Sequence, residues 1–233
     1  MKALKLFIAT AFMAMTTGAY AQFTNGKTSS ASTVNTEGWS RISVSYLPSK
    51  LKIDTKGADD YNFQGFSVGW TKGFNVVKSL PLFVETGAAL QFRTSSNSED
   101  YDDGYYNYEI SERLNVLSLN IPVNLIYKFN VNQDFSIEPM FGIDFRINMT
   151  GKYKITADDG TDSESEDFNI FNKGDMDDYL GVDPAKRFQA GWHIGANLTY
   201  KKITFGVNYG QDFNEIIEDC KLATTTVSLG YNF

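Results

Sequence analysis

The 233-residue sequence contains one cysteine, Cys220, and one histidine, His193. A single cysteine excludes an intrachain disulfide framework and a cysteine-rich metal site, so we interpret Cys220 as an incidental thiol in a loop. Basic residues are also few: 21 lysines and arginines stand against 28 aspartates and glutamates, with a formal net charge of −7. Binding to nucleic acid depends on Lys and Arg contacts to phosphate, so an acidic chain is a poor partner for it. We therefore expect no nucleic-acid partner.

The sequence has no apolar run long enough to cross a bilayer as a helix. The apolar stretch from Leu6 to Met15 is too short for a span. It follows Lys2 and Lys5 and precedes Ala19-Tyr20-Ala21, a pattern typical of a secretory signal peptide with an A-x-A cleavage site. We expect a signal peptide at residues 1–21, and the alternative for this stretch is a membrane anchor or a buried helix.

The chain that would remain after cleavage begins at Gln22, which is not the cysteine of a lipoprotein. Loss of the two lysines of the signal peptide would change its formal charge from −7 to −9. Its about 212 residues are enough for one domain. Residues 22–37 are polar and aperiodic, so we expect a flexible periplasmic leader.

Eight segments with strand character follow the leader. In each of them apolar residues alternate with polar or small ones, as where Leu117, Leu119 and Ile121 alternate with Ser118 and Asn120. Such alternation indicates strands that have an apolar medium on one face, and it does not fit the repeat of a helix. The expected strands cover residues 38–48, 62–73, 81–93, 112–129, 135–150, 187–200, 203–213 and 223–233.

The polar face of these segments is rich in Gly, Ser and Asn. A narrow transmembrane barrel needs small and polar side chains inside and an apolar belt toward lipid, whereas a soluble barrel needs large apolar residues inside. The many glycines favour the polar face as the crowded interior. The sequence therefore predicts an all-β fold, an eight-stranded antiparallel up-and-down transmembrane β-barrel at residues 38–233. If the polar face points outward, the alternative is a soluble ligand-binding barrel.

Short and long connections alternate along the chain. Outer-membrane barrels have short periplasmic turns and longer outside loops, and an even number of strands returns both termini to the same side. We therefore expect both termini in the periplasm of a bacterial cell. The expected short connections are 74–80, 130–134 and 201–202, and the expected long ones are 49–61, 94–111, 151–186 and 214–222.

Three stretches resemble a known family. They are 65–70 (GFSVGW), 119–129 (LNIPVNLIYKF) and the last strand, which ends on Phe233. They resemble the PorT-like small outer-membrane β-barrel proteins over roughly the whole chain after the leader, and 119–129 is the most specific stretch. The resemblance implies the fold and an outer-membrane location, and one branch of the family serves protein secretion. A terminal strand of this kind implies recognition by the barrel-assembly machinery through Val227, Leu229, Tyr231 and Phe233.

Pro122 lies within the most specific of these stretches. Proline cannot donate a hydrogen bond to a β-ladder and is normally found at sheet edges or bulges. Because a closed barrel has no edge, we expect a β-bulge at Pro122.

Charged residues of both signs lie on the polar face. An eight-stranded barrel is just wide enough for its side chains to fill, and unpaired buried charge is costly, so these groups are expected to pair and plug the interior. The alternative is a narrow path for solutes or protons lined by the same groups. The residues of this expected network are Arg41, Glu85, Arg93, Lys128, Glu138, Asp144, Arg146, His193 and Asp212.

His193 is the natural candidate for a catalytic base because it is the only histidine. Some eight-stranded outer-membrane barrels are lipid-modifying enzymes, and these need a histidine near a serine or a carboxylate at the outer rim. His193 lies several residues below the outer end of its expected strand, on the polar face. We therefore assign it to the network and expect no catalytic residue, no cofactor and no metal site.

Two of the expected outer loops are acidic. Carboxylate clusters can bind Ca²⁺, and Asp158, Asp159, Asp162 and Glu164 could form a weak Ca²⁺ loop, although they lack the spacing of an EF-hand. A solvated acidic loop is the simpler interpretation. Tyrosines among flexible polar residues, as in 94–111, also resemble adaptable binding surfaces.

The leading functional hypothesis is a non-enzymatic structural or surface-interaction protein of the outer membrane. Its expected partners are outer-membrane lipid, the barrel-assembly machinery during biogenesis, and an extracellular or envelope protein. A narrow porin-like channel, an accessory component of a protein-secretion machine and a lipid-modifying enzyme are the alternatives.

Overall fold

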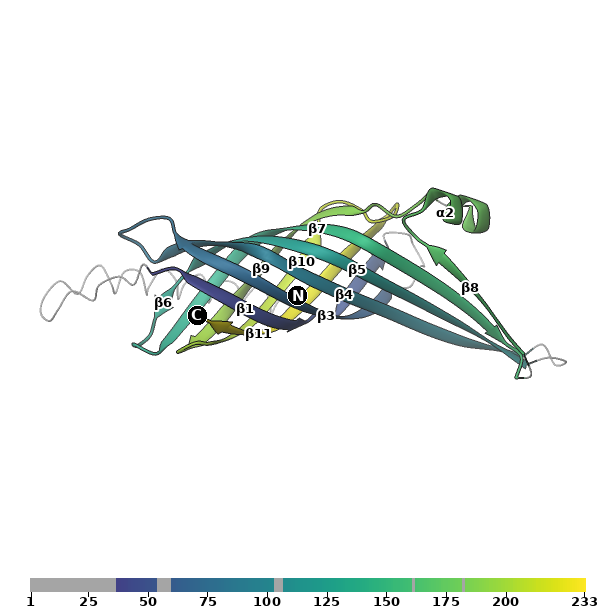
Figure 1. The fold of residues 1–233 in the computed structure, drawn as a ribbon, viewed down its shortest axis with the longest axis horizontal. Helices are drawn as coiled ribbons and strands as arrows, with labels where there is room; N and C mark the ends of the chain where they lie inside the picture. Colours follow the sequence, from purple (N-terminus) through teal and green to yellow (C-terminus); the bar gives the residue numbers. More distant parts are fainter. Residues whose placement is uncertain (1–36, 54–59, 103–106, 161, 182) are drawn as a thin grey trace, which may run out of the picture. The chain divides into compact units, whose positions relative to one another are not determined.

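The computed structural model describes residues 37–53, 60–102, 107–160, 162–181 and 183–233. The expected signal peptide and all but the last residue of the expected leader lie outside these residues. Within the described residues the chain forms strands and one short helix (Figure 1). The elements are β1 (Trp39–Tyr46), β2 (Ser49–Ile53), β3 (Tyr61–Asn75), β4 (Leu82–Asp102), β5 (Asn107–Tyr127), β6 (Phe129–Asn130), β7 (Phe135–Asp158), β8 (Ser163–Asn169), α2 (Lys173–Leu180), β9 (Phe188–Tyr200), β10 (Ile203–Asp212) and β11 (Cys220–Asn232).

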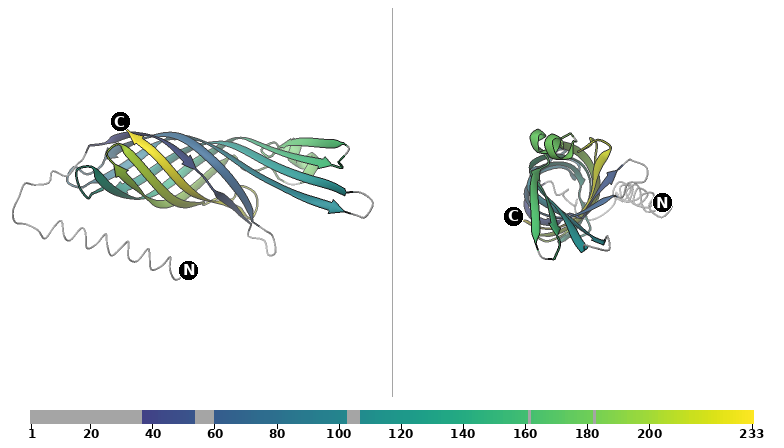
Figure 2. Two further views of the ribbon diagram at one scale, coloured as in Figure 1. Left: turned by 90° about the horizontal axis from the view of Figure 1, so that it is seen from below. Right: turned by 90° about the vertical axis from the view of Figure 1, so that its right-hand side faces the viewer.

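Eight strands form a closed antiparallel ring, as the sequence predicted. The ring runs β1, β11, β10, β9, β7, β5, β4 and β3, and it closes where β3 pairs with β1. The right-hand view of Figure 2 looks along the axis of this ring. Because each strand pairs with the next along the chain and the last pairs with the first, the topology is up-and-down. No helix in the described part of the chain is long and apolar enough to cross a membrane.

The polar face of the strands points into the ring. On β3, Phe66 and Val68 are 63% and 60% exposed, whereas Ser67 between them is 8% exposed. The same alternation holds on the other strands, so the outer surface carries an apolar belt and the polar side chains are buried inside. The alternative of a soluble barrel with an apolar interior is therefore wrong.

At one end of the ring β4, β5 and β7 continue well past the other strands (Figure 1). There β4 pairs with β5 out to Asp102 and Asn107, and β7 pairs with β8. The sequence placed connecting loops at 94–111 and 151–186, and this was wrong for most of their length. These segments lack apolar alternation because both faces of the extended sheet are largely in water. We call the sheet formed by 95–102, 107–115 and 151–158 together with β8 the extension.

The first expected loop is also partly a strand. Pro48 interrupts the first strand because proline has no amide hydrogen, but the chain resumes as β2 at Ser49 and pairs with both β11 and β3. Leu47 donates its amide hydrogen to Gly65 at 2.7 Å, and the Pro48 carbonyl accepts from Thr225 at 2.9 Å. The ring therefore stays closed across the break.

A small apolar core supports the base of the extension. Val116 of β5 packs with Ile170, Phe171 and Met176, which lie in and around the α2 segment. The N-terminus of α2 is capped by the Asn172 side chain, which accepts a hydrogen bond from the amide of Gly174 at 3.0 Å. The interpretation of 151–186 as a solvated acidic loop is thus wrong for its second half, where apolar residues between the acidic ones are buried.

The sequence predicted a β-bulge at Pro122, and this was wrong. Pairing between β5 and β7 is regular through Pro122, which lies opposite Asp144. The register shifts instead between Leu117 and Ser118, where Met149 is the extra residue on β7. On the β4 side the ladder stops at Thr86 and Val123 and resumes in the same register at Ala89 and Asn120, so the missing amide hydrogen of Pro122 leaves a local gap and not a bulge.

Candidate functional site

An apolar plug fills the lumen near the end where the short turns and Phe233 lie. Trp39, Phe83, Ile126 and Met140 form a buried cluster there, and the rings of Trp39 and Phe83 are 4.7 Å apart. Gly73 makes room for the indole, since a Cβ on it would lie 2.4 Å from the Trp39 ring. Aliphatic and aromatic groups in a narrow lumen repel water, so this cluster is a dry barrier.

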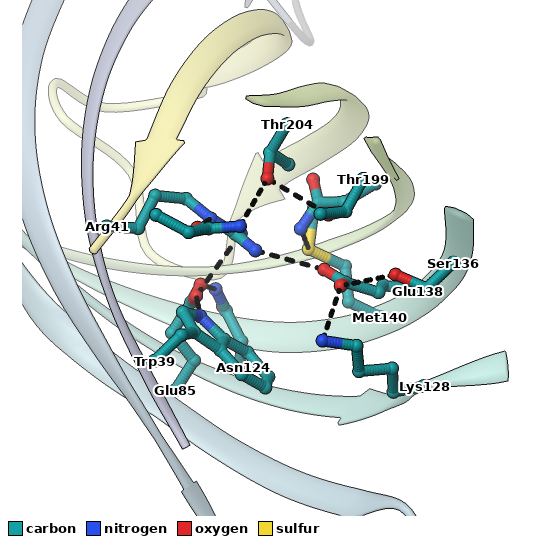
Figure 3. A network of polar contacts seen from close by, with 12 residues as sticks. Trp39, Arg41, Glu85, Asn124, Lys128, Ser136, Glu138, Met140, Thr199 and Thr204 are labelled. Carbon is teal, nitrogen blue, oxygen red and sulfur yellow. Dashed lines mark hydrogen bonds and ion pairs between the residues drawn. The ribbon is translucent and has the colours of Figure 1, made fainter. Parts of the chain in front are cut away.

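An ion cluster lies directly beside the plug (Figure 3). Arg41 of β1 contacts Glu85 of β4 at 3.3 Å and Glu138 of β7 at 3.0 Å. Glu138 is fully buried and also lies 3.7 Å from Lys128. The Trp39 indole donates a hydrogen bond to Glu85 at 2.6 Å, which ties the plug to the cluster. These contacts join strands from opposite sides of the ring.

A second ion cluster lies farther toward the extension. Arg146 of β7 contacts Asp212 of β10 at 2.5 Å, and the two side chains are almost completely buried. Arg93 of β4 donates hydrogen bonds to the Gln91 side chain at 2.8 Å and to the Ser49 hydroxyl at 3.3 Å.

His193 connects Asp144 to the first cluster. Its Nδ1 lies 2.5 Å from a carboxylate oxygen of Asp144, and its Nε2 lies 2.8 Å from the amide oxygen of Asn124. The Asn124 amide nitrogen in turn donates to Glu85 at 3.1 Å. Gly142 leaves the space for this contact, since a Cβ there would lie 2.4 Å from both Asn124 Oδ1 and His193 Nε2.

A cavity of about 150 Å³ lies in the lumen, lined by charged groups of both signs and by small side chains. The small side chains leave the space open where they line it. The cavity is lined there by Ser43, Ser67, Gly69, Gly210, Ser228 and Gly230. Its volume and polar lining give room for several water molecules on the extension side of the plug.

All nine residues of the expected charge network point into the lumen. Four ion-pair contacts and one histidine–carboxylate contact join eight of them, and Arg93 alone has no ion pair within the described part of the chain. The sequence interpretation missed the apolar plug because it chose residues by polarity. The spacing carried the signal, because each plug residue lies two positions from a polar residue on the same strand face: Trp39 from Arg41, Phe83 from Glu85, Ile126 from Asn124, and Met140 from Glu138.

The four carboxylates of the expected Ca²⁺ loop lie at the turn between β7 and β8. Asp158 accepts a hydrogen bond from the amide of Gly160 at 2.8 Å, and Asp159 accepts one from the amide of Asp162 at 2.7 Å. Glu164 is exposed on β8. In the residues that the structure describes, no three or more His, Cys, Asp or Glu side chains gather as a metal site would require.

The expected assembly signal lies on β11, next to β1. Leu229, Tyr231 and Phe233 are more than half exposed on the apolar belt, and Val227 is half-buried. The amide of Phe233 donates to the Ser40 carbonyl at 2.9 Å, so the last residue is held against the first strand.

Comparison with known proteins identifies the class. The sequence profile of the family described as "Outer membrane protein beta-barrel domain" matches residues 82–218, which is more than half of the chain. The chain belongs to this family. This outer-membrane β-barrel is accordingly a protein of the bacterial outer membrane.

Several solved structures are similar to this outer-membrane β-barrel. Ail, the attachment invasion locus protein of Yersinia pestis, has 17% sequence identity and a TM-score of 0.42 over 84% of this chain and 99% of that chain. Neisserial surface protein A has 11% identity and a TM-score of 0.38 over 83% and 97% of the two chains. The outer membrane enzyme PagL has 12% identity and a TM-score of 0.40 over 81% and 98%. At such low identity the likeness extends to the fold alone. No curated protein matches the chain.

Proposed function

We propose that this outer-membrane β-barrel is a non-enzymatic protein with a plugged lumen and an acidic extension that meets a partner outside the cell. The observation that carries this proposal is the filling of the lumen by buried ion pairs and by the apolar plug. A narrow barrel filled in this way has no wide aqueous pore. The polar and charged side chains that remain available to a partner are exposed on the extension.

We place both termini in the periplasm and the extension outside. Supporting this orientation, the described chain begins and ends at the end of the ring that carries the short turns, where the amide of Asn232 donates to the Lys202 carbonyl at 2.7 Å. A signal peptide at 1–21 and a leader at 22–37 fit export to the periplasm. β11 would then be read by the barrel-assembly machinery, and the apolar belt would contact outer-membrane lipid.

Cysteine labelling of intact cells tests the orientation. Cys220 is the only cysteine of the sequence, so Cys220→Ser gives a cysteine-free background. In that background we expect a membrane-impermeant maleimide to label Ser98→Cys on the extension and not Lys202→Cys at a short turn. Both sites should react after the outer membrane is permeabilised, and labelling of the Lys202 position alone on intact cells would reverse the assignment.

The partner is expected to bind through the exposed carboxylates of the extension. Glu99, Asp100, Glu164 and Glu166 are exposed on its outer strands. Their joint conversion to glutamine or asparagine should lower photo-crosslinking to any specific envelope or extracellular protein at least fivefold, measured by mass spectrometry. Asp134→Asn, at the end with the short turns, is the control and should leave the same crosslinks unchanged. Equal crosslinking by the wild type, the variant with four neutralised carboxylates and Asp134→Asn would contradict the surface-interaction proposal.

The lumen geometry supports a role without catalysis. A histidine acting as a general base needs a nucleophile or a substrate proton within hydrogen-bonding reach. His193 is 5% exposed and its two ring nitrogens already contact Asp144 and Asn124, with no serine hydroxyl at either position. His193→Ala should therefore change no modification of lipid A or of phospholipid.

Two other functions are supported by specific features. The cavity of about 150 Å³ supports a narrow channel for small solutes. The resemblance of 65–70, 119–129 and the terminal strand to PorT-like proteins supports an accessory role in protein secretion. Co-purification with secretion components would favour the latter over surface recognition.

A further inference from the structure

The four lumen carboxylates each contact a cationic side chain. Glu85 and Glu138 lie on either side of Arg41, and Lys128 also reaches Glu138. In the second cluster Asp212 contacts Arg146. The fourth carboxylate, Asp144, contacts His193 at 2.5 Å. No lumen carboxylate is therefore left over for a further cation.

The contacts of His193 indicate a doubly protonated ring. Asn124 must direct its amide nitrogen at Glu85, because a carboxylate can only accept a hydrogen bond there. Its amide oxygen therefore faces His193 Nε2, which must donate. Nδ1 faces the Asp144 carboxylate and donates as well. An imidazole that donates from both nitrogens is an imidazolium, so His193 counts as a cation in the lumen.

Arg93 is the surplus cation. It is 4% exposed, and its hydrogen bonds go to the neutral side chains of Gln91 and Ser49. No ion pair among the described residues includes Arg93. The two nearby lumen carboxylates contact other cations, since Asp212 contacts Arg146 and Asp144 contacts His193. A buried guanidinium without a counterion is costly.

Arg93 also lines the cavity of about 150 Å³, together with Arg146 and the hydroxyl-rich wall of Ser43 and Ser67. We propose that the lumen of this barrel holds a small inorganic anion, of the size and charge of chloride, beside the Arg93 guanidinium. The anion offsets the excess positive charge of the lumen, and serine hydroxyls complete its surroundings. The site is independent of any partner that binds the extension.

Chloride titration of the purified full-length protein in non-ionic detergent tests the site. Sodium gluconate replaces sodium chloride at constant ionic strength, because gluconate is a large anion. Wild-type protein should show a saturable rise in melting temperature of about 2–4 °C with chloride, since a ligand that binds only the folded state stabilises it. ³⁵Cl NMR line broadening gives a direct measure of chloride binding in the same samples.

Arg93→Gln removes the surplus charge and should abolish both the melting-temperature shift and the line broadening. Arg113→Gln, at an exposed arginine of the extension, is the matched control and should behave as wild type. His193→Gln keeps a polar side chain but removes one positive charge, and should weaken chloride binding about tenfold even if Arg93→Gln fails to fold. The proposal is overturned if wild type responds equally to chloride and gluconate, or if the response survives in both lumen variants.

Discussion

Glu138→Ala is expected to lower the free energy of unfolding of the barrel by about 3–5 kcal/mol, because it breaks a buried ion-pair network on one side only. Glu138 is fully buried, accepts hydrogen bonds from Arg41 and from the Ser136 hydroxyl, and forms an ion pair with Lys128. Without it, Arg41 and Lys128 remain in this cluster with one carboxylate, Glu85, which contacts Arg41. Urea unfolding of the detergent-refolded protein, followed by tryptophan fluorescence, measures the change.

The matched control is Glu164→Ala on β8, whose side chain is exposed. Surface substitutions of this kind change stability by only about 0.5 kcal/mol. If Glu138→Ala were as stable as this control, the lumen would be hydrated enough to screen its charges, and the plugged interior would have to be abandoned.

Trp39→Ala is expected to turn a silent barrel into one that conducts ions. The plug is the dry part of the lumen, while the remainder is polar and contains the cavity. An apolar constriction stops ions by excluding water, so removal of the largest ring should admit a water column. In planar bilayers we expect single-channel events at least tenfold above the wild-type background.

Trp70→Ala is the control for this experiment, because Trp70 faces the apolar belt and not the lumen. It removes the same side chain from the same barrel and should leave conductance at the wild-type level. A heat-modifiability gel establishes that each variant is folded. A folded Trp39→Ala protein that stays silent would make the Arg41–Glu138 cluster, and not the plug, the barrier to ions.

The strands within the membrane could be predicted from the sequence because lipid and the lumen impose different chemistry on successive residues. The same logic selected nine titratable residues whose side chains the structure places in the lumen. It could not identify their partners, since the contact between Arg41 and Glu138 joins residues 97 positions apart and depends on the curvature of the ring. Nor could it show that Arg93 lacks a carboxylate partner, because this depends on how all the other ion pairs of the lumen form.

The extension could not be predicted because its strands have water on both sides. In β8 the sequence Ser163-Glu164-Ser165-Glu166 shows no alternation of apolar and polar residues, although its backbone pairs fully with β7. The apolar core at Ile170 and Phe171 was hidden for a related reason: two apolar positions within an acidic stretch carry little periodic signal. Long-range pairing, and not local pattern, specifies this part of the fold.

The extra residue Met149 changes which residues of β7 face the interior. Before it, even-numbered residues such as Arg146 and Asn148 face the interior, and after it odd-numbered ones such as Gly151 and Tyr153 do so. Because side chains alternate with a period of two, loss of this one residue would exchange the two sides of everything beyond it. Lys152 would then enter the apolar core under the extension, and Tyr153 would face solvent. A single inserted residue thus allows one continuous strand to place even-numbered residues inward in its lipid-embedded segment and odd-numbered residues inward in its water-exposed segment.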